Sequence, residues 1–170
     1  MNAHFKLAIV LAATASLAAC KSNAPDDLPP EPGVSQPGGG DSGYTDPNGP
    51  GTQQHFVSAV NGQNVIYFDT DRYNIDTADA AALQTQAQYL SQYPSITVTI
   101  EGHADERGTR EYNLALGERR ANSAKNYLVS LGIAANRIRT VSYGEERPVA
   151  TASTPQAWAQ NRRAVTVVIN

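Results

Sequence analysis

Apolar and polar residues alternate strictly in SITVTIEG, residues 95–102, with Ile96, Val98 and Ile100 on one side and threonines and a glutamate on the other. Such alternation is typical of a β-strand with one buried face. Stretches rich in β-branched or aromatic residues predict three further strands, at 64–71, 137–144 and 164–170.

Between these strands the apolar residues recur every three or four positions. This spacing predicts a helix that is capped by Asp76 or Thr77 and ends before Pro94, a long helix at 111–131 and a short one at 154–163. Strands that alternate with helices predict an α/β (α+β) two-layer sandwich, in which a mixed four-stranded sheet packs against helices.

The N-terminus carries a lysine and then an apolar run of about a dozen residues, shorter than the ~20 residues that span a bilayer as a helix. We interpret residues 1–19 as a signal peptide. The run ends in LAAC, which resembles the lipobox of bacterial lipoproteins, and Cys20 is the only cysteine of the chain. The resemblance implies that Cys20 is lipidated, and that two or three acyl chains anchor the protein stably.

Lys21 follows the cysteine, at a position where aspartate would favour the inner membrane. The lipoprotein resemblance therefore implies a lipid anchor in the outer membrane of a Gram-negative bacterium, with the domain in the periplasm. Residues 20–54 are rich in Pro, Gly, Ser and Asp, which predicts a disordered tether. Residues 55–170 have the length of a single domain. The formal net charge of −3 and the lack of a basic patch argue against a nucleic-acid partner.

One arginine lies on the apolar stripe of the long helix, where Leu116, Arg120, Ala124 and Leu128 recur every four residues. A buried guanidinium needs a partner, and Asp105 is a candidate because it follows a strand at the edge where the helix begins. Asp71 leaves the first strand at the same edge if the two strands run parallel.

Two hypotheses remain open for these residues. Asp105 and Arg120 form an internal salt bridge that fixes the loop, or they receive a zwitterion, with the arginine on its carboxylate and an aspartate on its ammonium. A metal site built on His103, Asp105 and Glu106 has weak support, because one histidine with two acids is a poor ligand set. A glycosidase would need two carboxylates around the scissile bond, but an arginine beside Asp105 would keep that acid ionised. We expect no catalytic residue, metal or cofactor.

Four motifs carry a family resemblance: VIYFDTDRYNI, VTIEGHADERGTREYNLALGERRANSAKNYLVSLG, VSYGEERP and NRRAV. Together they resemble the peptidoglycan-associated lipoproteins of the Tol-Pal system and, more widely, the OmpA-like C-terminal domains. The resemblance covers essentially the whole predicted domain. It implies non-covalent binding of peptidoglycan through the meso-diaminopimelate of the stem peptide, with Asp105 and Arg120 as the main contacts and Asp71, Asn113 and Leu116 around them.

The resemblance further implies TolB as a partner and a role in outer-membrane invagination during cell division and in envelope integrity. An OmpA-like structural anchor that acts independently of TolB is the alternative. The sequence departs from the family pattern at Asn74, often aspartate, at Arg110, commonly proline, and at STPQAW, where many relatives carry an acidic stretch. These departures concern the rim of the predicted pocket and the partner surfaces.

Overall fold

The computed structural model describes residues 48–169. The predicted signal peptide, Cys20 and most of the predicted tether lie outside the described residues. Within 48–169 no helix is both long enough and apolar enough to cross a membrane.

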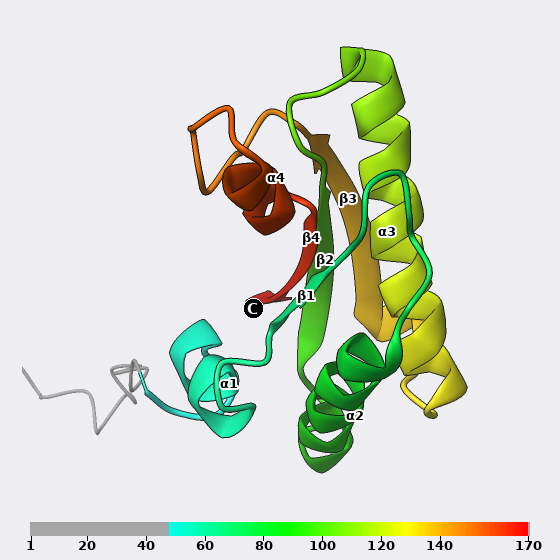
Figure 1. The fold of residues 1–170 in the computed structure, drawn as a ribbon. Helices are drawn as coiled ribbons and strands as arrows, with labels where there is room; N and C mark the ends of the chain where they lie inside the picture. Colours follow the sequence, from blue (N-terminus) through cyan, green and yellow to red (C-terminus); the bar gives the residue numbers. More distant parts are fainter. Residues whose placement is uncertain (1–47, 170) are drawn as a thin grey trace, which may run out of the picture. The chain divides into compact units, whose positions relative to one another are not determined.

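A single four-stranded sheet forms the centre of the domain, with strand order β1-β4-β2-β3 (Figure 1). β4 is antiparallel to both β1 and β2, and β2 is parallel to β3. The prediction of a mixed four-stranded sheet is therefore confirmed. The strands are β1 (Val65–Tyr67), β2 (Thr97–His103), β3 (Ile138–Gly144) and β4 (Arg163–Ile169).

β1 is much shorter than the predicted strand at 64–71. The ladder ends where the amide of Phe68 donates to the carbonyl of Arg162 at 2.9 Å. Beyond it the chain turns, and Asp71 has a φ of 56°, a left-handed conformation that no strand can continue.

Three of the helices agree with the predicted periodicity within a few residues: α2 (Thr77–Gln92), α3 (Arg110–Ser130) and α4 (Pro155–Asn161). Asp76 is the N-cap of α2, because its carboxylate accepts from the amide of Asp79 at 2.8 Å. The helix α1 (Gln53–Ala59) and a 3₁₀ turn (Ala135–Arg137) were not predicted.

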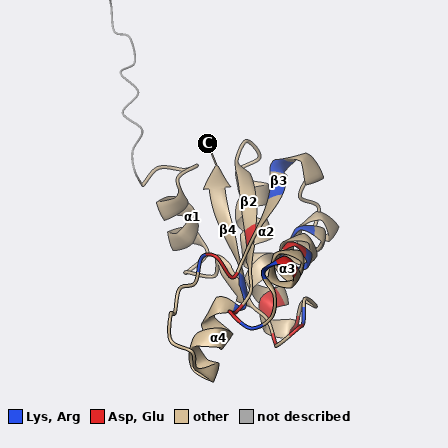
Figure 2. Cartoon of the chain, turned by 90° about the horizontal axis from the view of Figure 1, so that it is seen from above, with Lys and Arg blue, Asp and Glu red and all other residues tan. Residues whose placement is uncertain are grey.

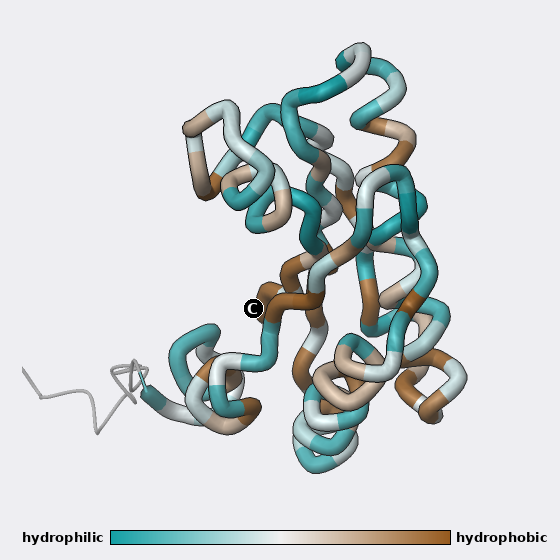
Figure 3. The backbone as a smooth tube through the Cα atoms, in the orientation of Figure 1, coloured by the Kyte–Doolittle hydropathy of each residue, from teal (hydrophilic) through white to brown (hydrophobic). Residues whose placement is uncertain are grey.

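Helices α2 and α3 cover one face of the sheet, and the apolar segments gather between these layers (Figures 1 and 3). α3 approaches β2 closely because two glycines meet at the crossing. A Cβ on Gly102 would overlap the carbonyl oxygen of Gly117, and one on Gly117 would overlap the hydroxyl of Ser142. This contact fixes the height of α3 over the sheet.

β1 is too short to pair with all of β4, and a side chain of α1 binds backbone groups of β4 that β1 does not reach. The side-chain amide of Gln53 accepts from the backbone N–H of Val168 at 2.7 Å and donates to the carbonyl of Thr166 at 3.4 Å. It thus takes the place of a strand residue. Phe56 on the same helix is fully buried. Gln53 and Gln54 are therefore helical, although the sequence analysis assigns them to the tether.

The strand directions bring several segments to one rim of the sheet. β1, β2 and β3 run the same way and end there, and the antiparallel β4 and the helix α3 begin there. Acidic and basic residues cluster along the loops at this rim, between α3 and α4 (Figure 2). A site at this rim would draw its residues from several of these elements.

Candidate functional site

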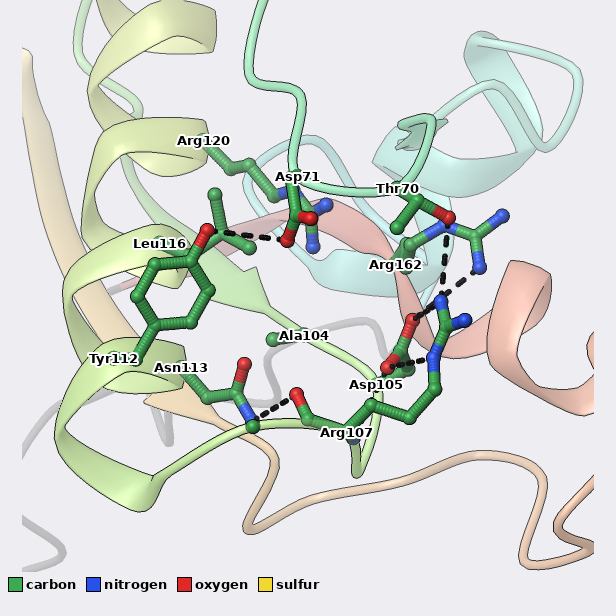
Figure 4. A pocket seen from close by; sticks show the side chains of 11 residues that line it. Thr70, Asp71, Ala104, Asp105, Arg107, Tyr112, Asn113, Leu116, Arg120 and Arg162 are labelled. Carbon is green, nitrogen blue, oxygen red and sulfur yellow. Dashed lines mark hydrogen bonds and ion pairs between the residues drawn. The ribbon is translucent and has the colours of Figure 1, made fainter.

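A cavity of about 310 Å³ opens at this rim (Figure 4). It is bounded by the loop after β1, the loop after β2, the first turns of α3 and the start of β4. All five residues predicted for the pocket line it. The full lining is Thr70, Asp71, Ala104, Asp105, Arg107, Gly108, Tyr112, Asn113, Leu116, Arg120 and Arg162.

Arg120 is fully buried on the sheet-facing side of α3, as its position on the apolar stripe predicted. Its guanidinium donates to three backbone carbonyls: Nε to Arg72 at 2.9 Å, Nη1 to His103 at 2.8 Å and Nη2 to Asp69 at 3.0 Å. Of the five N–H groups that a guanidinium carries, one on each terminal nitrogen remains without a hydrogen bond to the described residues.

Arg120 remains positively charged although its side chain is buried. Burial, and then the positive Arg162, lower its pKa to about 10, and the nearby Asp105 and Asp71 act in the opposite direction. The side chain is therefore protonated at neutral pH. It presents a positive charge from the floor of the cavity and at the same time holds the loop after β1 through two of its carbonyl contacts.

Asp105 is 6% exposed and pairs with arginines other than Arg120. Arg107 donates to it from the backbone at 3.1 Å, from Nε at 2.9 Å and from Nη2 at 2.8 Å, and Arg162 Nη1 lies 3.3 Å away. Among the ion pairs of residues 48–169 none joins Asp105 to Arg120. The hypothesis of an internal Asp105–Arg120 salt bridge is therefore wrong.

Burial raises the pKa of Asp105, but hydrogen bonds from Arg107 and Arg162 outweigh burial and hold that pKa below its usual value. The carboxylate is therefore ionised at neutral pH, as the sequence analysis expected. Arg107 and Arg162 keep it ionised, whereas the sequence analysis attributed this effect to Arg120.

Asp71 reaches the same rim because β1 and β2 run in the same direction, with β4 between them. Its left-handed backbone turns the side chain towards the cavity, where its carboxylate accepts from the hydroxyl of Tyr112 at 3.1 Å. This hydrogen bond raises the pKa of Tyr112. Asp71 is exposed.

Asn113 and Leu116 form the wall that α3 contributes. The amide nitrogen of Asn113 donates to the carbonyl of Arg107 at 3.1 Å and to the carboxylate of Glu145. Leu116 is 4% exposed and gives the cavity an apolar surface. The wall can therefore pack against a hydrocarbon segment while its polar group fixes the loop that carries Arg107.

Sequence reasoning missed six residues of the lining: Thr70, Ala104, Arg107, Gly108, Tyr112 and Arg162. Arg107 follows Asp105 by two positions, but the sequence analysis gives it no role. Arg162 stands in the NRRAV motif immediately before β4. Its location at the rim follows only when β4 is known to be antiparallel to its neighbours, which no residue pattern shows.

His103 is buried, and its side-chain contacts within residues 48–169 do not include Asp105. Its ring stacks near Tyr143, with centroids 5.6 Å apart, and its Nε2 lies 3.8 Å from the carboxylate of Glu101. Within residues 48–169 no group of His, Cys, Asp and Glu has an arrangement that could hold a metal ion. His103 contributes to the cavity through its backbone carbonyl, which accepts a hydrogen bond from Arg120.

The sequence profile of the OmpA family matches residues 67–162, which is more than half of the chain and includes every residue of the cavity lining. The chain belongs to the OmpA family. The motif resemblance is thereby confirmed. The OmpA-family match begins in β1 and ends at Arg162, immediately before β4.

Two relatives that share at least half of the aligned residues with this chain are both named "Peptidoglycan-associated lipoprotein". That of Rhizobium meliloti (strain 1021) is 50% identical over 162 residues, 94% of this chain and 85% of that protein. That of Agrobacterium fabrum is 55% identical over 119 residues, 70% of this chain and 66% of that protein.

Solved structures agree with these relatives. The peptidoglycan-associated lipoprotein from Burkholderia pseudomallei has a TM-score of 0.62 at 40% identity, over 74% of this chain and 98% of that chain. The C-terminal domain of Helicobacter pylori MotB has a TM-score of 0.59 at 18% identity, over 62% of this chain and 84% of that chain, which shows a common fold alone.

Proposed function

We propose that the protein is an outer-membrane lipoprotein that binds peptidoglycan non-covalently, and that its rim cavity takes the free end of meso-diaminopimelate in the stem peptide. That end carries an ammonium and a carboxylate on one carbon. In the proposed complex the guanidinium of Arg120 holds the carboxylate, and the carboxylate of Asp105 takes the ammonium. Asp71, Asn113 and Leu116 complete the pocket.

The observation that supports this function best is the presence of both signs of charge in one cavity. Arg107, Arg120 and Arg162 line it together with Asp71 and Asp105. Such a lining fits a ligand group that carries both charges better than a simple cation or a simple anion. Charge-assisted hydrogen bonds of this kind are roughly twice as strong as neutral ones.

Arg120 is equipped for the carboxylate because each of its terminal nitrogens keeps one N–H after the three carbonyl contacts. The planar guanidinium matches the two oxygens of a carboxylate. Leu116 and the ring of Tyr112 offer apolar surface for the methylene chain of diaminopimelate. We expect binding without catalysis.

The name shared by the relatives, and the lipobox-like LAAC, support the membrane part of the proposal. Residues 1–19 would be removed as a signal peptide, and Cys20 would carry the acyl chains. Residues 20–54 would tether the domain in the periplasm, within reach of the wall. Replacement of Cys20 by alanine should release the protein from the outer-membrane fraction, and retention of the variant there would contradict the lipid anchor.

The proposed site is tested by co-sedimentation of the full chain, purified in a mild detergent, with peptidoglycan of the diaminopimelate type and of the lysine type. Lysine lacks the distal carboxylate. The wild type should prefer the diaminopimelate wall. Arg120→Lys should lose that preference, and Asp105→Asn should bind both walls more weakly. Arg119→Lys, the same change on the exposed side of α3, is the matched control and should bind as the wild type does.

Arg120→Lys is the informative variant because it separates structure from binding. A lysine ammonium has three donors, which is the number of carbonyls that Arg120 serves. A lysine that keeps these contacts has no N–H left for a ligand. If folded Arg120→Lys and Asp105→Asn sediment as the wild type does, the ligand binds elsewhere.

As a peptidoglycan-associated lipoprotein of the Tol-Pal system, the protein would bind TolB, help the outer membrane to invaginate during cell division and preserve envelope integrity. The alternative is an OmpA-like anchor that acts without TolB. Pull-down of the full chain with purified TolB distinguishes the two, since both functions require peptidoglycan binding. Absence of TolB from the pull-down would favour the alternative.

A further inference from the structure

Asp105 has no vacant position for a ligand ammonium. Arg107 occupies both carboxylate oxygens, with its Nε at 2.9 Å from Oδ1 and its Nη2 at 2.8 Å from Oδ2. The backbone amide of Arg107 and Nη1 of Arg162 take further positions at 3.1 Å and 3.3 Å. A ligand that is to pair with Asp105 must therefore replace an arginine.

The two arginines differ in how firmly they are held. The Arg162 side chain is 13% exposed, and its Nε is bonded to the carbonyl of Phe68 at 2.8 Å. The Arg107 side chain is 41% exposed, and its contact outside Asp105 and Trp158 is the hydroxyl of Thr70 at 3.2 Å. Arg107 is more exposed than Arg162 and its hydrogen bond outside Asp105 is longer, so Arg107 is the arginine that can leave.

A second location for the guanidinium already exists beside it. Arg107 lies over the ring of Trp158, 4.3 Å from the centroid, and the Nε1 of Trp158 donates to the carboxylate of Glu106 at 2.9 Å. A guanidinium that slides along this ring keeps its cation–π contact and approaches a solvated acid. The departure of Arg107 from Asp105 therefore leaves it with favourable contacts.

We infer that Arg107 is the specificity-determining residue of the pocket. It neutralises Asp105 in the empty site, and the ammonium of the ligand displaces it along Trp158 towards Glu106. This inference rests on the proposed zwitterion site and adds an exchange of cations to it.

The exchange explains how the pocket would select a ligand with both charges. A ligand that has an ammonium alone must displace Arg107 and gains nothing at Arg120. A ligand that has a carboxylate alone reaches Arg120 but leaves Arg107 on Asp105. A ligand with both groups makes one charged contact at Arg120 and another at Asp105, so it should bind best.

Three stem tetrapeptides, which differ at one residue, test the exchange. L-Ala-γ-D-Glu-X-D-Ala carries at X meso-diaminopimelate, with both distal charges, L-lysine, with the ammonium alone, or 2-aminopimelate, with the carboxylate alone. The full chain in mild detergent is titrated with each. Trp158 is the single tryptophan of the chain and does not line the cavity, so its fluorescence reports the motion of Arg107 and not direct contact with the ligand.

In the wild type the diaminopimelate peptide should bind best and change the Trp158 fluorescence. In Arg107→Ala the lysine peptide should bind on the order of three- to tenfold more tightly than to the wild type. The 2-aminopimelate peptide should gain nothing, and the fluorescence change should disappear. Arg110→Ala is the matched control: Arg110 pairs with Glu146 at the same rim but touches neither Asp105 nor Trp158. It should retain the wild-type pattern.

Two results would overturn the inference. If Arg107→Ala binds all three peptides as the wild type does, Arg107 does not move and the ammonium goes elsewhere, such as to Asp71. If Arg107→Ala loses affinity for the lysine peptide, Arg107 assists the ammonium and does not compete with it. Failure of the proposed function looks different, because the wild type itself would then not prefer the diaminopimelate peptide.

Discussion

Replacement of Arg120 by alanine should destabilise the fold in the absence of any ligand. The change removes three hydrogen bonds of 2.8–3.0 Å from a charged donor to the carbonyls of Asp69, Arg72 and His103. At ~1.5–3 kcal/mol for each such bond, the loss would be roughly 5–9 kcal/mol.

Two effects reduce that figure. The lowering of the Arg120 pKa to about 10 means that burial already disfavours the charge by roughly 3 kcal/mol, and alanine recovers this penalty. Water can also enter from the adjoining cavity and hydrate the abandoned carbonyls. We therefore expect a net loss of about 2–4 kcal/mol in the free energy of unfolding.

Urea denaturation followed by circular dichroism measures this loss, which corresponds to a midpoint lower by about 1–3 M. Arg119→Ala is the matched control. It removes the neighbouring arginine, whose guanidinium lies 5.9 Å from the exposed ring of Tyr73, and should stay within ~0.5 kcal/mol of the wild type. If both variants unfold at the same urea concentration, the loop after β1 is not held by Arg120.

Three further predictions concern stability measured in the same way. His103 is 1% exposed, and burial, followed by two nearby arginines, lowers its pKa from 6.5 to about 4. Between these pH values the unfolded chain binds a proton that the fold does not, so stability should fall by up to ~3 kcal/mol as pH drops through the window; His103→Phe should flatten this dependence, and an unchanged pH profile would contradict it. Gly117→Ala should destabilise by ~1–3 kcal/mol because its Cβ would overlap Ser142 and crowd Gly102. Helix propensity alone predicts a gain of ~1 kcal/mol, so the sign of the change decides. Gln53→Ala should cost about 1 kcal/mol by opening the edge of β4 that its amide covers, and wild-type stability of this variant would show that the amide pairing contributes nothing.

The long elements of the fold were predictable because their periodicity is strong. β2 alternates from Thr97 to Gly102, and α2 and α3 carry apolar residues at helical spacing. α1 escaped because it is short, buries Phe56 alone among its residues, and is joined to β4 by the side chain of Gln53. A side chain that pairs with a strand edge leaves no pattern in the sequence.

The sequence predicted the location of the site but not the hydrogen-bond partners of its residues. A strand end and a helical stripe were enough to bring Asp105 and Arg120 to one rim. The actual partners of Arg120 are backbone carbonyls, which every residue carries, so no residue type could identify them. The partners of Asp105 were visible as residues, but their contacts depend on the turn after β2 and on the direction of β4.

The central claim is that Arg120 holds the distal carboxylate of diaminopimelate. A thermodynamic cycle tests it directly: calorimetric affinities of the wild type and of Arg120→Lys for the diaminopimelate and lysine tetrapeptides. The claim predicts that loss of the carboxylate weakens binding to the wild type by roughly 10- to 100-fold, which is the range for hydrogen bonds to charged groups, and weakens binding to Arg120→Lys far less. The same ratio of affinities in both proteins would contradict the claim, because the carboxylate would then not interact with Arg120.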